Sequence, residues 1–317
     1  MTYSPSPSHD LCTLVLEDGR RLAYSDYGAP SGYPVIFAHG MPGSRLEGRF
    51  FDEQARAAGF RILALDRPGI GASNYQPDRR LLDYSDDVGQ FADQLELASF
   101  VHMGWSSGGS RTLACAYSLG DRISQAVVLS GYTHFAELPD SHTLLLKTRW
   151  PGPVLAELST PLFRAVVDVV VWISRRRPGI YLRKARSMVS EQDRQLLEDE
   201  TLRDYFREDQ IACLDSGGRA IATDLLTEMT DWGFRLAQVP VPTLIYQGQQ
   251  DPFVPERFAH HMAEHITGAD LNLLPESGHL YPLDPGFQAG LFHRLQDILG
   301  LEAPNGTRTR ANEANPV

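Results

Sequence analysis

The sequence predicts an α/β fold in which a mostly parallel central sheet is covered by helices on both faces and carries an inserted helical cap. Three observations predict it: short apolar runs alternate with helical segments over residues 1–132, the alternation stops over 133–236, and it resumes over 237–300. Short apolar strands separated by helices are typical of a parallel sheet with both faces covered. The two alternating parts therefore belong to one sheet, and the helical block between them is a cap inserted in one loop.

The elements of the first part follow one another at the spacing of strand–helix units. The turn Glu17–Arg20 joins two predicted strands. The predicted strands cover 11–16, 21–27, 34–38, 61–65, 100–103 and 123–129, and the predicted helices cover 47–58, 84–97 and 107–119.

The second part repeats the pattern after the cap. Strands are predicted over 242–246 and 270–274, and helices over 255–266 and 285–299. Residues 301–317 are polar and show no periodicity, so we expect a disordered tail there.

Composition excludes several classes of protein. Of 317 residues, 42% are hydrophobic and 22% charged, which is enough for a large core, and the net charge of −11 argues against a nucleic-acid partner. The longest apolar stretch, 165–173, contains Asp168 and is too short to span a bilayer. No secretory leader is readable, and the three widely spaced cysteines form no Cys-x-x-Cys pair. We expect a cytoplasmic protein without a stable membrane anchor.

Residues 104–108 read Gly-Trp-Ser-Ser-Gly and fit the Gly-x-Ser-x-Gly pattern of a nucleophile elbow. The motif follows an apolar strand and precedes a helix. A nucleophile elbow is a sharp turn between a strand and a helix, so this context supports the match. In a turn this sharp, the glycines let strand and helix pass closely, and the hydroxyl of Ser106 is exposed at the carboxyl edge of the sheet. The sequence therefore predicts Ser106 as a nucleophile.

A serine nucleophile requires a base and an orienting carboxylate, which in this fold class follow it in the order Asp or Glu, then His. Asp251 lies in the loop after the strand 242–246, and His279 lies in the loop after the next strand. Both loops leave the same sheet edge as Ser106. We predict Asp251 as the acid and His279 as the base. Glu276 is too near His279 in sequence to come from a separate strand end.

The loop after the strand 34–38 is predicted to complete the oxyanion hole. Acyl transfer requires N–H donors directed at the developing oxyanion, and we assign these to the backbones of Met41 and Ser107. The neighbouring Trp105, His39 and Gly40 are predicted to line the substrate site.

One rival motif points to a metal. Residues 261–265 read His-Met-Ala-Glu-His and match the pattern of inverted zinc proteases. The motif lies on a predicted outer helix without an evident third ligand, so we interpret it as a solvated helix face. The sequence predicts no metal and no cofactor.

The motifs together resemble the α/β-hydrolase superfamily of the capped type. They are His-Gly-Met-Pro-Gly-Ser (39–44), Asp-Arg-Pro-Gly-Ile-Gly-Ala-Ser (66–73), Gly-Trp-Ser-Ser-Gly-Gly (104–109), Gly-Gln-Gln-Asp-Pro (248–252) and Gly-His (278–279). The resemblance covers about 11–132 and 237–300 and implies a Ser–His–Asp hydrolase. Serine at the elbow argues against the haloalkane dehalogenases and epoxide hydrolases, which use aspartate there. Met41 stands where prolyl iminopeptidases usually carry glycine.

The cap carries one unusual segment, the apolar stretch 161–174, in which Arg164 and Asp168 are the charged residues. Three interpretations stay open: a buried helix lining an acyl pocket, a homodimer contact, or a lid on a membrane surface. Basic runs follow at 175–177 and 183–186. We expect them to pair with the acidic run 198–200; attraction of an anionic substrate or lipid head group is the alternative.

The sequence thus predicts a serine hydrolase that cleaves a carboxylic ester or lactone of a moderately apolar small molecule. The same triad also serves aminopeptidases, carbon–carbon bond hydrolases and cofactor-free perhydrolases, so these alternatives remain. A carboxylate at Glu137, Asp140 or Glu208 that binds a substrate amine would favour an aminopeptidase. A non-catalytic ligand-binding protein on the same fold is the remaining reading.

Overall fold

A computed structural model describes residues 11–148 and 151–302. Its strands form one eight-stranded sheet in the order β1-β2-β4-β3-β5-β6-β7-β8, in which β1 and β2 are antiparallel to their neighbours and all other pairs are parallel. The strands are β1 (Cys12–Val15), β2 (Arg21–Gly28), β3 (Tyr33–Ala38), β4 (Phe60–Leu65), β5 (Phe100–Trp105), β6 (Ile123–Leu129), β7 (Thr243–Gly248) and β8 (Ala269–Leu274). The mostly parallel sheet predicted from the sequence is confirmed.

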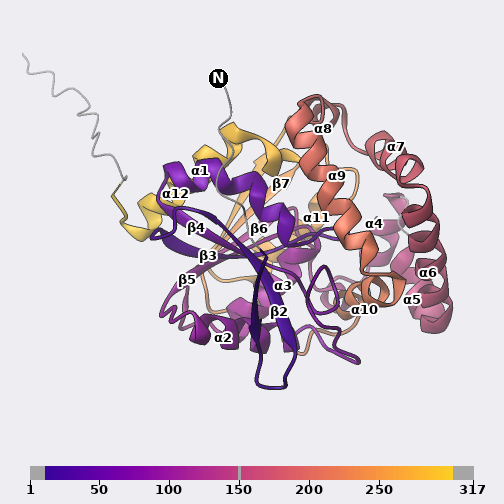
Figure 1. Ribbon diagram of the computed structural model, residues 1–317, viewed down its shortest axis with the longest axis horizontal. Helices are drawn as coiled ribbons and strands as arrows, with labels where there is room; N and C mark the ends of the chain where they lie inside the picture. Colours follow the sequence, from indigo (N-terminus) through magenta and orange to yellow (C-terminus); the bar gives the residue numbers. More distant parts are fainter. Residues whose placement is uncertain (1–10, 149–150, 303–317) are drawn as a thin grey trace, which may run out of the picture.

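Helices cover both faces of the sheet, as predicted (Figure 1). On one face, α2 (Asp83–Gln94), α3 (Ser107–Ser118) and α11 (Glu256–His265) bury apolar side chains in one core cluster. On the other face, η1 (Arg45–Phe51), α1 (Asp52–Ala57) and α12 (Pro285–Leu299) contribute to a second cluster. The central strands β3, β5 and β6 are almost completely buried, which explains why they read as continuous apolar runs.

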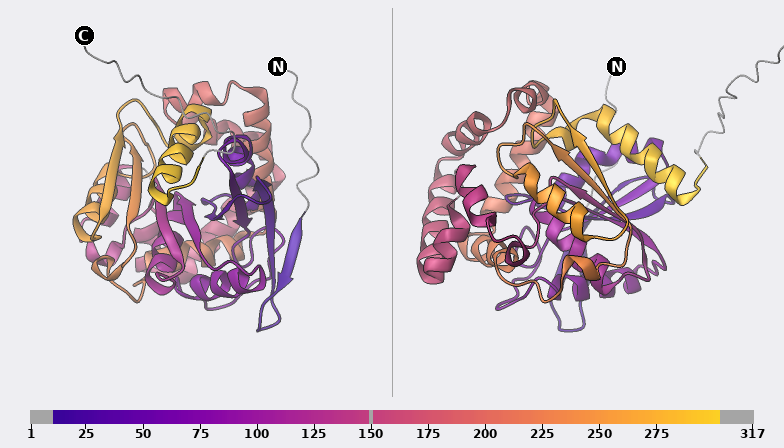
Figure 2. Two further views of the ribbon diagram at one scale, coloured as in Figure 1. Left: turned by 90° about the vertical axis from the view of Figure 1, so that its left-hand side faces the viewer. Right: turned by 180° about the vertical axis from the view of Figure 1, so that it is seen from behind.

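The described residues between β6 and β7 form helices and no strand. They are η2 (Phe135–Glu137), α4 (Ser141–Lys147), α5 (Gly152–Leu158), α6 (Thr160–Arg176), α7 (Pro178–Met188), α8 (Glu191–Leu196), α9 (Glu200–Asp215), α10 (Gly218–Met229) and η3 (Leu236–Gln238). Figure 2 shows these helices gathered at one side of the sheet. The remaining short helix, η4 (Tyr281–Leu283), follows the predicted base.

Helix α6 is not buried on all sides. Ser159 caps its N-terminus by accepting a hydrogen bond from the Leu162 N–H at 3.4 Å. Phe163, Val167 and Val171 are buried against the cap core, but Val169 is 56% exposed. The helix therefore has an inner apolar face that packs in the cap and an outer apolar face in solvent.

The predicted pairing of the basic runs with residues 198–200 is wrong. Asp199 instead caps α9 by accepting from the Leu202 N–H at 2.9 Å, and Glu200 pairs with Arg203 within its own helix at 3.2 Å. These two carboxylates therefore bind groups of their own helix, by capping and by i,i+3 pairing, and not the basic runs.

Within residues 11–148 and 151–302, no helix has the length and hydropathy needed to cross a membrane. Of the predicted tail, residues 303–317 lie outside the described residues.

Candidate active site

Ser106 lies at the turn between β5 and α3. Its φ of 55° and ψ of −121° are an unusual conformation for a non-glycine residue. A Cβ at Gly104 would lie 2.2 Å from the Gly108 carbonyl oxygen, and one at Gly108 would lie 2.0 Å from the Ala38 carbonyl oxygen. Only glycine fits at both positions, so the motif allows the close approach that the sharp turn requires. Strain of this kind is typical of a functional site.

His279 and Asp251 form the expected base–carboxylate pair. The Nδ1 atom of His279 lies 2.6 Å from Oδ2 of Asp251. Asp251 is itself fixed, because its Oδ1 accepts hydrogen bonds from the N–H groups of Phe253 at 2.8 Å and Val254 at 3.0 Å. Because Nδ1 faces the carboxylate, Nε2 is the ring nitrogen that can accept a proton from a serine hydroxyl.

The surroundings of His279 change its affinity for a proton. Burial lowers the pKa of His279, but the charges of Asp251 and Asp193 and the hydrogen bond to Asp251 outweigh burial, so the pKa lies above its ordinary value of 6.5. The imidazolium is therefore stabilised, which suits a base that takes a proton from a serine hydroxyl.

The structure brings the three predicted triad residues to one edge of the sheet. The indole Nε1–H of Trp105, the residue before Ser106, donates to the backbone carbonyl of His279 at 3.2 Å. The Trp105 and His279 rings lie 5.7 Å apart. Trp105 is buried, as Ser106 and His279 are, and its hydrogen bond holds the loop of the proposed base; that Trp105 lines the substrate site stays a prediction.

The predicted oxyanion loop lies beside the nucleophile. A Cβ built on Gly40 would be 3.4 Å from Cβ of Ser106. Among the described residues, neither the Met41 N–H nor the Ser107 N–H donates to another protein group. Ser107 begins α3, where the first N–H groups of a helix lack an intrahelical partner. Both donors are thus available to an oxyanion.

His39 has a structural role. Its ring is completely buried, Nδ1 lies 2.7 Å from the Gly40 carbonyl oxygen, and Nε2 accepts from the Arg67 N–H at 3.2 Å. Burial and the nearby Arg67 charge hold the pKa of His39 well below its ordinary value, so the ring is neutral. Both nitrogens are used within the protein, and the predicted contact of this ring with substrate is not supported.

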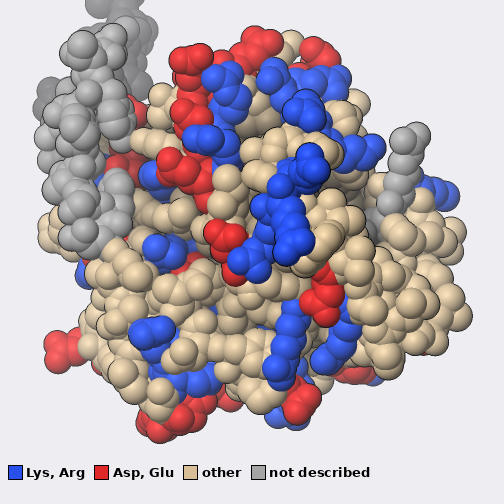
Figure 3. All heavy atoms as spheres, turned by 45° about the vertical axis from the view of Figure 1, so that its right-hand side comes forward, with Lys and Arg blue, Asp and Glu red and all other residues tan. Residues whose placement is uncertain are grey.

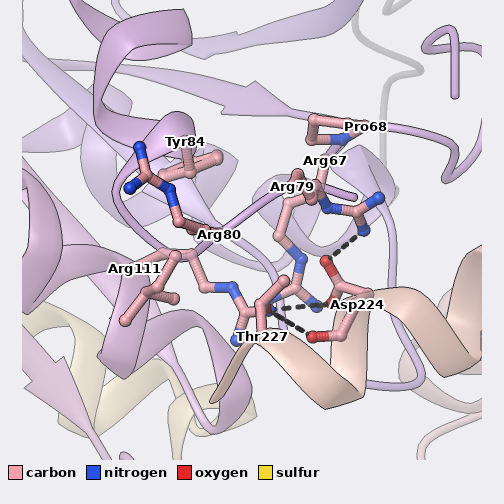
Figure 4. A pocket seen from close by; sticks show the side chains of 9 residues that line it. Arg67, Pro68, Arg79, Arg80, Tyr84, Arg111, Asp224 and Thr227 are labelled. Atoms are coloured by element: carbon pink, nitrogen blue, oxygen red, sulfur yellow. Dashed lines mark hydrogen bonds and ion pairs between the residues drawn. The ribbon is translucent and has the colours of Figure 1, made fainter. Parts of the chain in front are cut away.

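A cluster of buried charges lies behind the elbow (Figure 4). Asp224 on α10 is within 3.0 Å of Arg67, 2.9 Å of Arg79 and 3.3 Å of Arg111. Although burial opposes ionisation, the three guanidinium groups hold the pKa of Asp224 well below its ordinary value. A cavity of about 10 Å³ lies among these side chains.

Arg67 and Arg111 link this cluster to the predicted oxyanion loop and to the start of α3. Arg67 donates to the Gly40 carbonyl at 2.9 Å and to Oγ of Ser107 at 3.2 Å. Arg111 pairs at 2.7 Å with Glu228, whose carboxylate accepts from Oγ of Ser107 at 3.0 Å. The sequence shows the motif at residues 66–73 but not the ion pair of its arginine with Asp224, because Asp224 lies more than 150 residues away on the cap.

A second cap carboxylate binds the loop of the base. Asp193 on α8 accepts from the N–H groups of His279 and Leu280, both at 2.9 Å. It also completes the capping box of α8 with Ser190. The Ser-x-x-Asp spacing signals a helix start, and nothing in it signals the contact with His279.

A third cap carboxylate binds the oxyanion loop. Asp209 on α9 accepts from the Ser44 N–H at 2.8 Å and the Ser44 hydroxyl at 2.6 Å, and Gln210 donates to the Pro42 carbonyl at 2.6 Å. Glu47 lies under the same loop and accepts from the Gly40 N–H at 2.7 Å. Burial raises the pKa of Asp209 to about 7 and that of Glu47 well above its ordinary value.

The inner faces of the cap helices bring apolar side chains to the same loop. Met41 packs against a cluster that contains Phe163 and Val167 of α6 and Leu225 of α10. The thiol of Cys213 lies 3.6 Å from the Met41 sulfur. The cap therefore meets the oxyanion loop with apolar side chains around Met41 and with polar side chains, Asp209 and Gln210, around Pro42 and Ser44.

The rival metal motif has other contacts. Nδ1 of His261 lies 2.7 Å from the Thr133 hydroxyl, and Nδ1 of His265 lies 2.8 Å from the His261 carbonyl oxygen. In the part of the chain that the structure describes, no three His, Cys, Asp or Glu side chains are grouped to hold a metal ion.

Comparison with known proteins agrees with this geometry. Residues 33–285 match the family described as alpha/beta hydrolase fold. A non-heme chloroperoxidase from Streptomyces lividans is 33% identical over 123 residues, 37% of this chain and 44% of that protein. A 2-hydroxy-6-oxononadienedioate/2-hydroxy-6-oxononatrienedioate hydrolase from Burkholderia vietnamiensis is 25% identical over 276 residues, 84% of this chain and 87% of that protein.

Solved structures are similar over almost the whole chain. A thermophilic esterase from Thermogutta terrifontis has a TM-score of 0.68 at 22% identity and covers 91% of this chain and 99% of its own. An esterase from Exiguobacterium antarcticum has a TM-score of 0.66 at 20% identity, covering 90% and 98%. Sequence identity this low supports the fold alone. The family match over residues 33–285 goes further: the chain belongs to the α/β-hydrolase fold family and is a hydrolase.

Proposed function

We propose that the protein is a serine esterase that cleaves a carboxylic ester or lactone of a moderately apolar small molecule. The observation that carries the proposal is the pairing of His279 Nδ1 with Asp251 at 2.6 Å, on the sheet edge that also holds the strained Ser106. This arrangement supports nucleophilic acyl transfer because it gives a serine hydroxyl a base whose charged form is stabilised.

In the proposed reaction, Ser106 Oγ attacks the acyl carbonyl while His279 Nε2 takes its proton. The N–H groups of Met41 and Ser107 donate to the oxyanion of the tetrahedral intermediate. As the intermediate collapses, His279 returns the proton to the leaving alkoxide, and the alcohol departs. Water then attacks the acyl-enzyme with His279 again as base, releasing the acid and restoring Ser106.

The cap supports a neutral, apolar acyl group. The side chains around Met41 are apolar, and the buried cap carboxylates are all bound to protein donors. Glu137 accepts from the Leu236 N–H at 3.1 Å and lies 2.9 Å from His134, while Glu208 pairs with Arg49 at 2.8 Å. Asp140, the third carboxylate considered, is exposed at the start of α4. Carboxylates that are paired within the protein or exposed in this way do not favour recognition of a substrate amine, so the aminopeptidase alternative gains no support.

The carbon–carbon hydrolase alternative meets a different difficulty. The related Burkholderia enzyme is named for a dioate, a substrate with two carboxylates. Arg67 and Arg111, the guanidinium groups beside Ser107, are neutralised by Asp224 and Glu228. A site whose nearest arginines are already paired fits a neutral ester better than a dicarboxylate.

The test is a series of initial rates on p-nitrophenyl esters from acetate to palmitate. We expect turnover with an optimum acyl length, and a loss of at least about a thousandfold in Ser106→Ala because the nucleophile is absent. Circular dichroism should show an unchanged fold, and Ser118→Ala, at the other end of α3, should retain wild-type rates.

A fluorophosphonate probe separates the nucleophile from the substrate class. Labelling of wild type but not of Ser106→Ala, with no turnover of any ester, would keep the nucleophile and reject the esterase. Turnover of a 2-hydroxy-6-oxo dienoate would then favour the carbon–carbon hydrolase. Wild-type ester rates in Ser106→Ala would contradict the mechanism itself.

A further inference from the structure

The outer surface of the cap gathers most of the exposed apolar side chains. Thirteen large apolar residues are exposed in the described part of the chain, and nine of them lie between residues 158 and 188. These nine are Leu158, Leu162, Val166, Val169, Val170, Trp172, Ile173, Ile180 and Met188. We call this set the apolar cap face. So large an exposed apolar surface marks an interaction site.

Six of the nine residues of the apolar cap face lie on α6, and the other three lie on α5 and α7. Leu162, Val166, Val169 and Ile173 follow one another at steps of four, three and four residues, which places them on one side of the helix. The opposite side packs into the cap core through Phe163 and other buried residues. The inner side chains therefore hold the helix in place. The outer side chains do not pack in the cap core and can contact a partner.

Basic residues accompany this face. Residues 158–188 contain seven Lys and Arg residues but one acidic residue, Asp168. The basic residues are Arg164, Arg175, Arg176, Arg177, Arg183, Lys184 and Arg186. Figure 3, which turns the cap toward the viewer, shows Lys and Arg side chains beside a broad uncharged area.

Most of these cations have no ion-pair partner among the described residues. Arg175 pairs with Asp215 at 3.3 Å. Of the remaining six, none forms an ion pair with any residue in 11–148 or 151–302. The Arg176 guanidinium lies 4.2 Å above the Trp172 ring, so a cation and an indole are presented together on the outer surface.

We propose that the apolar cap face docks on a lipid bilayer that contains anionic lipids. An apolar helix face with tryptophan, bordered by arginine and lysine, is the pattern of a helix that lies in the plane of a membrane interface. The apolar side chains enter the boundary of the acyl chains, while the cations bind lipid phosphates. The contact is peripheral and spans nothing, and it does not depend on the bond that the active site cleaves.

Charge selects this occupant over a second copy of the chain. The protein carries a net charge of −11, yet residues 158–188 carry an excess of six positive charges. At physiological salt, charges more than about 8 Å away are largely screened, so the local cations decide the attraction to a surface. A two-fold dimer through this face would bring the two basic clusters toward one another's surface without supplying acidic partners.

Vesicle co-sedimentation of the full chain tests the proposal. We expect binding to vesicles of phosphatidylcholine with 30% phosphatidylglycerol, and binding about tenfold weaker or less to phosphatidylcholine alone. Raising the salt concentration should weaken binding to the anionic vesicles.

Two variants test the two components of the face. Val169→Asp places a charge at a 56% exposed apolar position, and Arg177→Gln/Arg183→Gln/Arg186→Gln removes three cations; each should weaken binding about tenfold or more. The matched controls are Ile298→Asp, an exposed apolar residue on α12, and Arg80→Gln/Arg207→Gln/Arg235→Gln, three exposed arginines elsewhere. Both controls should bind as wild type does.

Trp172 provides a local reporter. Its emission should shift to shorter wavelength on anionic vesicles, and Trp172→Phe should abolish the shift. Failure to sediment with anionic vesicles, or binding that the face variants leave unchanged, would overturn the proposal. A dimer in sedimentation velocity that Val169→Asp dissociates, without vesicle binding, would instead assign the face to self-association.

Discussion

Asp193 shows how one cap residue acts on the proposed base through the backbone of its loop. Its two carboxylate oxygens accept the N–H groups of His279 and Leu280, and its charge contributes to the raised pKa of His279. It is a positioning residue: it fixes the loop from which the imidazole projects and favours the imidazolium.

Replacing Asp193 by asparagine should therefore alter both rate and pH dependence. His279 must be neutral to act as base, so activity falls as the pH drops through its pKa, and the raised pKa places this limb above pH 6.5 in wild type. Asp193→Asn removes a nearby negative charge and should move the limb to lower pH. The loss of one backbone hydrogen bond should lower kcat by about ten- to a hundredfold. Profiles of kcat/KM against pH check both effects.

Asp199→Asn is the matched control for Asp193→Asn. Asp199 is the N-cap of the neighbouring helix α9, where it accepts from the Leu202 N–H, and among the described residues it forms no hydrogen bond with the loop of the proposed base. It should leave the acid limb where it is in wild type. An acid limb unmoved in Asp193→Asn would show that the carboxylate does not act through His279.

At the scale of elements, α9 and η1 enclose the oxyanion loop with two buried carboxyl groups. Asp209 accepts from the Ser44 N–H and hydroxyl, and Glu47 accepts from the Gly40 N–H. Burial, with the charge of its neighbour added for Glu47, raises the pKa of both groups. The loop is therefore held by hydrogen bonds whose acceptors are costly to ionise.

This arrangement predicts the effect of pH on stability. The pKa of Asp209 is raised to about 7 from an ordinary value of 3.8, so folding binds a proton, and stability is lost as the pH rises through that interval. Asp209→Asn keeps an oxygen that accepts from Ser44 but has no charge to bury. It should raise the free energy of unfolding by on the order of 2 kcal/mol at pH 8, and by progressively less as the pH falls toward 4.

Urea unfolding at several pH values measures this difference. Asp215→Asn, an exposed residue on the same helix, should change stability little at any pH. A stability gain in Asp209→Asn that is the same at pH 5 and pH 8 would contradict the assignment of the effect to ionisation.

The elements of the core could be predicted from the sequence because their signals are local. The run 123–129 forms an almost completely buried strand between β5 and β7 and ends in a polar turn, and its observed bounds equal the predicted ones. The elbow was predictable for the same reason, since both glycines lie within two residues of Ser106. Asp251 and His279 were predicted at the same edge because each follows a strand of a parallel sheet, and the carboxyl ends of parallel strands share one edge.

The cap was predictable only in outline. The contacts of Asp193, Asp209 and Asp224 each join residues at least 80 positions apart, and an isolated aspartate in a helical segment carries no sign of its partner. The orientation of α6 was open for a related reason: a helix that is apolar on most sides does not reveal which side is buried. The predicted pairing of the basic runs was wrong because opposite charge alone does not select a partner. Asp199 and Glu200 instead bind groups three residues away in their own helix.

At the scale of the whole molecule, cap carboxylates bind three parts of the candidate active site in the core. Carboxylates from α8, α9 and α10 bind the base loop, the oxyanion loop and the arginines behind the elbow, respectively. Figure 1 shows these three helices on the side of the cap that faces the sheet. Because ion pairs and hydrogen bonds to both parts are buried, we expect cap and core to unfold together.

The buried cluster around Asp224 is the strongest of these joints, and its removal is the most severe change we predict. Asp224→Asn leaves Arg67, Arg79 and Arg111 with one carboxylate partner, Glu228, in a site closed to water. Because the lost charge compensated three buried cations, the free energy of unfolding at pH 7 should fall by about 3–5 kcal/mol. Glu200→Gln, which breaks the exposed pair with Arg203, should cost less than about 1 kcal/mol.

Calorimetry with circular dichroism should show one transition in wild type, and two separate transitions would mean that the cap folds independently of the core.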